Sequence, residues 1–215
     1  MLPRRPLLLV FGFVSLMGCD NVEPRPFAPG QGQDPNASGV PYPSGPYGVE
    51  IGSVIGNYSF KGMVNPAVDT TFVDMQLADF YNPTGEESFA PESVYGEKPK
   101  PKALWINISA VWCGPCQFES EEILPEEHEK FAPKGAELIV LLADGATVGK
   151  PATENNLLTW TSSYGTAWPA VIDPTYKLAS LFQSSAYPIN IVIDTTTMQI
   201  AAVGTGLPSE DSAFF

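Results

Sequence analysis

Two cysteines three positions apart, Cys113 and Cys116, are the residues of this sequence whose spacing points to covalent chemistry. Gly114 and Pro115 lie between them and Trp112 precedes them, in the stretch "WCGPC". Such a pair can act as a redox-active dithiol, contribute half of a metal site or form a structural disulfide. A disulfide that closes so short a loop constrains the unfolded chain little, because the entropic gain grows with loop length. The spacing therefore favours redox chemistry over a purely structural cross-link.

The cysteine and histidine count argues against a metal site. The chain contains three cysteines and one histidine, His128. A tetrahedral zinc site takes four ligands, usually two Cys pairs or a Cys pair with a His pair. Cys113 and Cys116 could recruit only His128, so a closed intrachain site of Cys and His cannot be completed. A c-type haem attachment needs His directly after the second Cys, where Gln117 stands. We therefore predict no metal and no other cofactor.

The segments on either side of the pair predict a strand that ends at it and a helix that begins there. "KALWINISAV", residues 102–111, is an apolar run with branched residues that predicts a buried central strand. A helix is expected from about Cys113 to Ala132, with a kink near Pro125, because proline interrupts the hydrogen bonding of a helix. Residues three apart on a helix are neighbours, so both sulfurs would lie on one face of the first turn.

This placement predicts different roles for the two thiols. At the helix N-terminus, unpaired N–H groups and the helix dipole stabilise a thiolate at Cys113. Pro115 fits the first turn because its missing N–H would be unpaired there in any case. We expect Cys113 to be the exposed nucleophile that forms a mixed disulfide with a substrate. Cys116 is expected to be the shielded resolving thiol that breaks this mixed disulfide.

Strand and helix patterns alternate along the rest of the chain. Strands are predicted at "NYSFKGMV", "TFVDMQLADF", "AELIVLLAD", "PAVID", "INIVID" and "QIAAVGT". Further helices are predicted at "TENNLLTWTSSY" and "TYKLASLF". Alternating strands and helices predict an α/β fold around a mixed sheet.

The site and its flanks resemble a known family. "WCGPC" after a hydrophobic strand, with a proline-bearing helix behind it, resembles the thioredoxin-fold active site. Over residues 49–206 the pattern resembles the membrane-anchored TlpA/ResA-like redoxins, through "FVDMQLADFY", "CQFE", "WPAVIDPTYKLASLF" and "AYPINIVID". The resemblance implies a thioredoxin-like three-layer sandwich with helices on both faces of a mixed central sheet and an N-terminal strand extension. It also implies thiol–disulfide oxidoreductase activity.

The resemblance assigns roles to four further residues. Pro188 matches the proline whose preceding peptide bond is cis in this fold and which packs against the dithiol. Tyr187 occupies the place where the backbone can pair with a substrate chain like an added strand. Glu119 matches a glutamate that ResA-like members place beside the dithiol, where it could exchange protons with the thiols; a solvated carboxylate on the helix face is the alternative. Asn107 departs from thioredoxin, which often carries a buried acid there, so either Glu119 and water take the Cys116 proton or the second step of the exchange is slow.

The N-terminus predicts export. Residues 1–18 combine the basic "MLPRRP" with "LLLVFGFVSLM", an apolar run shorter than the about 20 residues that a membrane span takes. The run leads into "LMGC", which resembles a bacterial lipoprotein signal with Cys19 as the lipidated mature N-terminus. An ordinary cleaved signal peptide with an incidental Cys is the alternative. Either way the mature protein works outside the cytoplasm, where disulfides persist.

Composition divides the remaining chain. Residues 19–48 hold the lipidated Cys and a Pro- and Gly-rich segment without apolar periodicity, which predicts a tether. The redoxin domain is expected at 49–210, and residues 211–215 form a tail. The formal net charge is −13 and the pI is near 4.3, which argue against nucleic-acid binding. We expect a monomer that is held at the membrane by lipid on Cys19.

A peroxidase of the peroxiredoxin type shares this fold but fits the residues poorly. It needs Thr or Ser three positions before the reactive Cys, where Ala110 precedes Cys113. It also needs an arginine, and Arg4, Arg5 and Arg25 all lie outside the expected domain.

We predict an enzyme that reduces disulfides of envelope proteins and is itself reduced by a separate thiol electron donor. A separate donor is needed because Cys19 is assigned to lipid, which leaves no second Cys pair to reset the site. The Gly-Pro pair favours this direction by resemblance. A disulfide oxidase or isomerase of the same fold, and a non-enzymatic binding lipoprotein with a permanent disulfide, are the alternatives.

Overall fold

The computed structural model describes residues 41–182 and 186–207. The predicted signal segment, Cys19, the tether up to residue 40 and the tail lie outside these ranges. Within the described part of the chain, no helix has both the length and the apolar character needed to cross a membrane.

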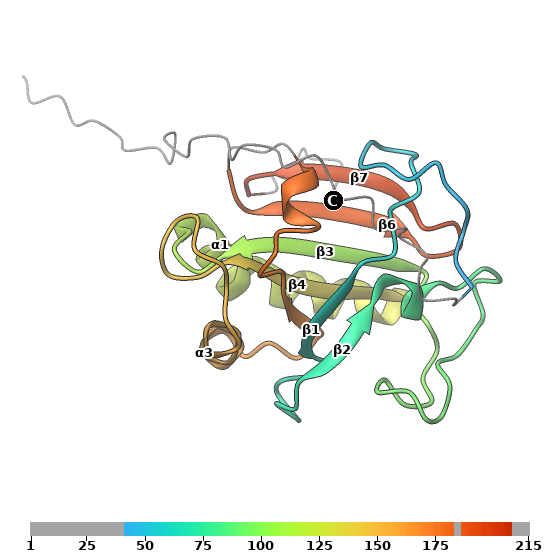
Figure 1. The fold of residues 1–215 in the computed structure, drawn as a ribbon. Coiled ribbons are helices and arrows are strands. Elements are labelled where there is room, and N and C mark those ends of the chain that lie inside the picture. Colours follow the sequence, from blue (N-terminus) through green and yellow to red (C-terminus); the bar gives the residue numbers. More distant parts are fainter. Residues whose placement is uncertain (1–40, 183–185, 208–215) are drawn as a thin grey trace, which may run out of the picture.

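A seven-stranded mixed sheet forms the centre of the domain, with the strand order β2-β1-β5-β4-β3-β6-β7 (Figure 1). Its strands are β1 (Ser59–Met63), β2 (Val73–Gln76), β3 (Ala103–Ala110), β4 (Ala136–Asp144), β5 (Ala170–Ile172), β6 (Ile189–Asp194) and β7 (Gln199–Thr205). β3, β4 and β5 are parallel, whereas β1, β2, β6 and β7 pair antiparallel. The predicted α/β fold is confirmed, and β1 and β2 form the N-terminal strand extension at one edge.

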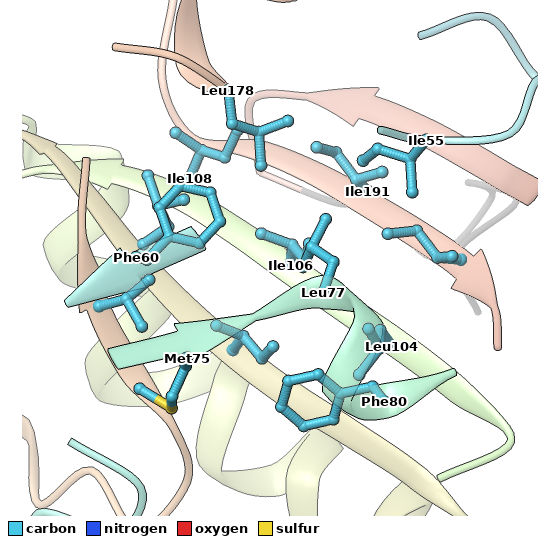
Figure 2. Close-up of a cluster of buried hydrophobic side chains, with 14 of the residues drawn as sticks. Ile55, Phe60, Met75, Leu77, Phe80, Leu104, Ile106, Ile108, Leu178 and Ile191 are labelled. Atoms are coloured by element: carbon cyan, nitrogen blue, oxygen red, sulfur yellow. The ribbon is translucent and has the colours of Figure 1, made fainter. Parts of the chain in front are cut away.

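Both faces of the sheet are covered, which gives the predicted three layers. On the first face lie two 3-10 turns, η1 (Leu77–Phe80) and η4 (Ala179–Leu181), together with residues 81–102. The core beneath them is built from Phe60, Leu77, Phe80, Leu104, Ile106, Ile108, Leu178 and Ile191, among others (Figure 2). On the second face lie the three α-helices, α1 (Gly114–Phe118), α2 (Leu124–Phe131) and α3 (Glu154–Tyr164).

The strand before the cysteines is β3, whose side chains alternate between the two faces because of the period of two along a strand. Ile106 and Ile108 are buried in the core of the first face. Trp105 belongs to the core of the second face, and Asn107 and Ser109 alternate with the isoleucines. β3 is therefore a buried central strand, as predicted, but its second face carries polar groups.

The predicted long helix after the cysteines is divided. α1 passes into a π-helical turn, η2 (Glu119–Ile123), before α2 begins and the 3-10 turn η3 (Ala132–Lys134) ends the segment. The N–H of Leu124 donates to the carbonyl of Glu119, five residues back. Pro125, which has no N–H and whose ring crowds the preceding turn, follows directly, so the wider turn takes the place of the predicted kink.

The predicted helix at "TYKLASLF" is wrong, because among these residues only η4 is helical. Tyr176 has a φ of 56°, which breaks a right-handed helix at its start. The carboxylate of Asp173 accepts the N–H groups of Lys177, Leu178 and Ala179, which stabilises a turn in place of helical bonds.

Candidate active site

The two cysteines lie where β3 passes into α1. Cys113 is the N-cap residue of α1, and its Sγ accepts the backbone N–H of Cys116 at 3.3 Å. The sulfurs of Cys113 and Cys116 are joined as a disulfide, with the Cα atoms 5.3 Å apart. Pro115 stands in the first turn, as predicted. In the reduced form the same N–H would favour a thiolate on Cys113.

The sequence predicted an exposed Cys113, but the structure buries it. Its exposed fraction is 2% in this disulfide form, and that of Cys116 is 0%. The Sγ of Cys113 lies 3.4 Å from the carbonyl oxygen of Tyr187. Trp112 and Tyr187 both pack against the core that holds the cysteines, with their ring centroids 6.1 Å apart. This cover comes from a segment far away in sequence, so local spacing could not predict it.

The Tyr187–Pro188 peptide bond is cis, as predicted. The N–H of Gly206 at the end of β7 donates to the carbonyl of Pro188 at 2.8 Å. The preceding carbonyl, that of Tyr187, faces Cys113. The backbone of Tyr187 is therefore placed beside the reactive sulfur, and its pairing with a substrate chain stays a prediction.

Asp144 anchors Trp112, and sequence reasoning missed it. The indole N–H of Trp112 and the backbone N–H of Gly149 both donate to Oδ2 of Asp144 at 3.0 Å, and the hydroxyl of Tyr176 donates to Oδ1 at 2.7 Å. Asp144 is fully buried at the end of β4. An acid that ends a buried strand next to the motif strand was the available signal.

We expect Asp144→Ala to lower the free energy of unfolding by about 2 kcal/mol, because three N–H or O–H donors lose their acceptor. The fluorescence of Trp112 should change as its ring loses this anchor. Urea unfolding and emission spectra measure both effects. Asp74→Ala, at an exposed position of β2, is the matched control and should change stability by at most about 0.5 kcal/mol. An unchanged unfolding midpoint in Asp144→Ala would contradict the anchoring role.

Glu119 is fully buried, so the alternative of a solvated carboxylate is wrong. Asn107 Nδ2 donates to its Oε2 at 2.6 Å, and Asn190 Nδ2 donates to its Oε1 at 2.8 Å. Burial raises the pKa of Glu119 from 4.5 to about 7, while these two amide donors act in the opposite direction. Glu119 lies three residues after Cys116, and its N–H donates to the Cys116 carbonyl. A carboxyl with this pKa can take up or release a proton near neutral pH.

The polar group around Glu119 continues into β3 and β6. Trp105 Nε1 donates to Asn190 Oδ1 at 2.7 Å, and Asn107 Nδ2 donates to the same oxygen at 2.9 Å. The hydroxyl of Ser109 donates to Asn107 Oδ1 at 2.6 Å. Of these residues the sequence identified only Asn107. The alternation in "LWINISA", which places polar residues on one face of a central strand, was the missed signal.

Metal ligands do not gather in the described ranges, 41–182 and 186–207, where no three His, Cys, Asp or Glu side chains are grouped for an ion. His128 instead packs against Trp168, with ring centroids 4.8 Å apart. Burial lowers the pKa of His128.

No model of a known protein family matches the chain, and no curated protein does. Solved structures do match. A candidate thiol:disulfide interchange protein DsbE from Chlorobium tepidum is 16% identical with a TM-score of 0.53, over 76% of this chain and 90% of that one. An uncharacterised conserved protein from Geobacillus kaustophilus is 15% identical with a TM-score of 0.51, over 76% and 74%.

AhpC from Enterococcus faecalis is 14% identical with a TM-score of 0.50, over 72% of this chain and 80% of that one. At such low identity these matches establish architecture and not activity. Together with the mixed sheet and its covering layers, they show that the chain has the thioredoxin-like fold.

Proposed function

We propose that this protein is a thiol–disulfide oxidoreductase that works outside the cytoplasm and reduces disulfides of envelope proteins. One observation carries the proposal. Cys113 caps the helix that contains Cys116, and the two residues form a disulfide. Cys113 also faces the carbonyl of Tyr187, which precedes the cis Pro188. A dithiol between a helix N-terminus and the backbone before a cis proline is suited to exchange disulfides with another chain.

The reaction proceeds by two exchanges. The Cys113 thiolate attacks one sulfur of the substrate disulfide, forms a mixed disulfide and releases the other substrate sulfur as a thiolate. Cys116 then loses its proton and attacks Cys113 Sγ, which forms the Cys113–Cys116 disulfide and releases the second substrate thiolate. Two electrons pass from protein to substrate, and the substrate thiolates take up two protons.

Glu119 is the acceptor that we assign to the Cys116 proton. It follows Cys116 by one helical turn, is buried like it, and has a pKa raised to about 7. Asn107 occupies the place of the acid expected in thioredoxin and cannot accept a proton, but it donates to Glu119. The proton-accepting function thus moves from the strand to the helix.

The cellular setting follows from the N-terminal sequence. Lipid on Cys19 would hold the protein at a membrane, and the Pro- and Gly-rich residues 20–40 would let the domain reach envelope proteins. Residues 41–48, predicted as the end of the tether, pack on the domain instead: the Tyr42 hydroxyl donates to the Ile55 carbonyl at 2.8 Å, and the Gly48 N–H donates to the Val54 carbonyl at 3.0 Å. A separate thiol donor is required to restore Cys113 and Cys116 after each cycle. We place the protein in this envelope setting as a monomer.

The burial of Cys113 favours one rival, a binding lipoprotein with a permanent disulfide. Reduction of the folded protein with increasing thiol concentrations distinguishes this rival from the proposed oxidoreductase. An exchanging dithiol is reduced by millimolar thiol in the folded state, whereas a permanent disulfide resists reduction until the protein unfolds.

In cells we expect Cys113 and Cys116 to be largely reduced at steady state, because a reductase is kept charged by its donor. Acid quenching followed by labelling with a thiol reagent measures the redox state. A Cys113→Ser/Cys116→Ser variant shows where the protein with neither thiol labelled runs on the gel. A pair found almost wholly oxidised would overturn the reductase direction and favour an oxidase or isomerase.

A further inference from the structure

The triplet Ile-Asn-Ile occurs in both β3 and β6, and the two copies pair with each other. In the antiparallel register, Asn107 lies opposite Asn190, Ile106 opposite Ile191 and Ile108 opposite Ile189. All four isoleucines are buried in the core of the first face. By alternation, both asparagines lie on the second face, where Glu119 is buried. Two asparagines at the centre of a sheet are a costly choice unless their amides are paired.

The polarity of the hydrogen bonds fixes how both amides are turned. The indole N–H of Trp105 can only donate, so the group that faces it on Asn190 must be the oxygen. The NH₂ group of Asn190 is thereby turned toward Oε1 of Glu119. Asn107 directs its NH₂ group at the same Asn190 oxygen and at Oε2 of Glu119. The indole N–H of Trp105 thus sets the orientation of the Asn190 amide, and Asn190 in turn sets that of Asn107.

We propose that Asn190 is a positioning residue of the dithiol site: Trp105 fixes its amide, and Asn190 and Asn107 together hold both carboxylate oxygens of Glu119. This arrangement is here named the amide clamp. Its role in exchange rests on the proposed function, because Glu119 is the group assigned to the Cys116 proton. Whether the amide clamp controls the ionisation of Glu119 does not depend on the proposed function.

The clamp has a measurable consequence for the ionisation of Glu119. Two N–H donors on the carboxylate favour the charged form and counteract burial. The other carboxylates on the same helical segment are exposed, namely Glu121, Glu122, Glu126 and Glu129, except for Glu127, which forms an ion pair with Lys130. The causes that set the pKa of Glu119 are burial and the two amides. The thiols of Cys113 and Cys116 also titrate when reduced, so the disulfide form is the one to measure.

The test is a titration of the Glu119 carboxyl carbon by NMR in the oxidised full chain, with Glu119→Gln to assign the signal. In Asn190→Leu we expect the midpoint to rise by about 1 to 2 pH units, because one charge-assisted hydrogen bond is lost. Trp105→Phe removes the N–H, together with part of the ring, while keeping both amides of the clamp, and should raise the midpoint less. Adding Trp105→Phe to Asn190→Leu should change nothing further, because Trp105 acts through Asn190. Asn155→Leu, exposed on α3, is the matched control without a shift.

An unchanged midpoint in folded Asn190→Leu would overturn the clamp and leave Asn190 a structural residue. If Asn190→Leu does not fold, Trp105→Phe decides: an unchanged midpoint overturns the proposal and a raised one supports it. Additive shifts in the double variant would also overturn it. The readout needs no substrate. A protein with the expected titration that fails to exchange disulfides would refute the proposed function and leave the clamp standing.

Discussion

Replacing Cys113 with serine is expected to reduce disulfide exchange to the uncatalysed level, whereas Cys116→Ser is expected to capture substrates as stable mixed disulfides at Cys113. The reason is geometric. Only Cys113 stands at the N-terminus of α1, where its Sγ accepts an N–H and faces the Tyr187 carbonyl. Cys116 lies inside α1 and is fully buried, so we expect it to react only with a sulfur that is already attached to Cys113.

The experiment compares both variants in a Cys19→Ser background, so that a third thiol does not contribute. Exchange with a disulfide substrate gives the rate, and non-reducing gels show captured partners. The double variant Cys113→Ser/Cys116→Ser is the control for non-specific capture. If Cys116→Ser captured nothing and alkylation of the reduced protein favoured Cys116, the two roles would be assigned wrongly. Capture would also show that Cys113 becomes accessible when it is not joined to Cys116.

Local signals were sufficient for the elements that carry the dithiol. β3 is a largely apolar run that ends at the motif, and a strand of this kind is typically buried on both faces of a sheet. Pro115 and the following residues favour a helix start whatever packs against it. The cis bond before Pro188 came from the resemblance and not from any local propensity.

The parts that the sequence did not predict depend on long-range pairing. Asn190 acquires its meaning only when β6 pairs with β3, which places it against Asn107, 83 positions away. Cys113 is covered by Tyr187, 74 positions away. Asp144 ends a predicted buried strand, but its partner Trp112 is identified only by the fold. Each of these contacts is set by strand register, which a single sequence specifies only through the whole fold.

The helix errors have a different origin. Apolar periodicity in "TYKLASLF" predicts a helix, but the Asp173 carboxylate takes its first N–H groups and Tyr176 adopts positive φ. After Cys116 the segment is helical, as predicted, but it is not a regular α-helix. The π-turn before Pro125 has more residues per turn and so rotates the following side chains around the helix axis. That turn begins at Glu119, whose carboxylate is buried against Asn107 of β3 and Asn190 of β6, whereas one of the two expectations was an exposed carboxylate.

Glu119→Gln is expected to slow the attack of Cys116 on the mixed disulfide by about 10²- to 10⁴-fold, the usual contribution of a general base. The pKa of Glu119 is raised to about 7, so the wild-type rate should climb with pH and level off above neutrality as the carboxylate forms. The variant should lack this rise. Stopped-flow mixing of a preformed mixed disulfide at Cys113 isolates the step. Glu121→Gln, exposed on the same turn, is the matched control with the wild-type profile.

The Glu119 carboxyl should also make the free energy of unfolding depend on pH, and the raised pKa fixes the direction of that dependence. The pKa of Glu119 is about 7 in the folded protein against an ordinary 4.5, so the folded state binds more protons in this range. Its contribution is complete below pH 4.5 and is lost as pH rises through 7. Between pH 5 and pH 8, urea unfolding should show Glu119→Gln gaining on the wild type by about 2 to 3 kcal/mol. A difference between the two proteins that does not change with pH would contradict a buried Glu119 that ionises near neutrality, and with it the assignment of this carboxyl as the proton acceptor.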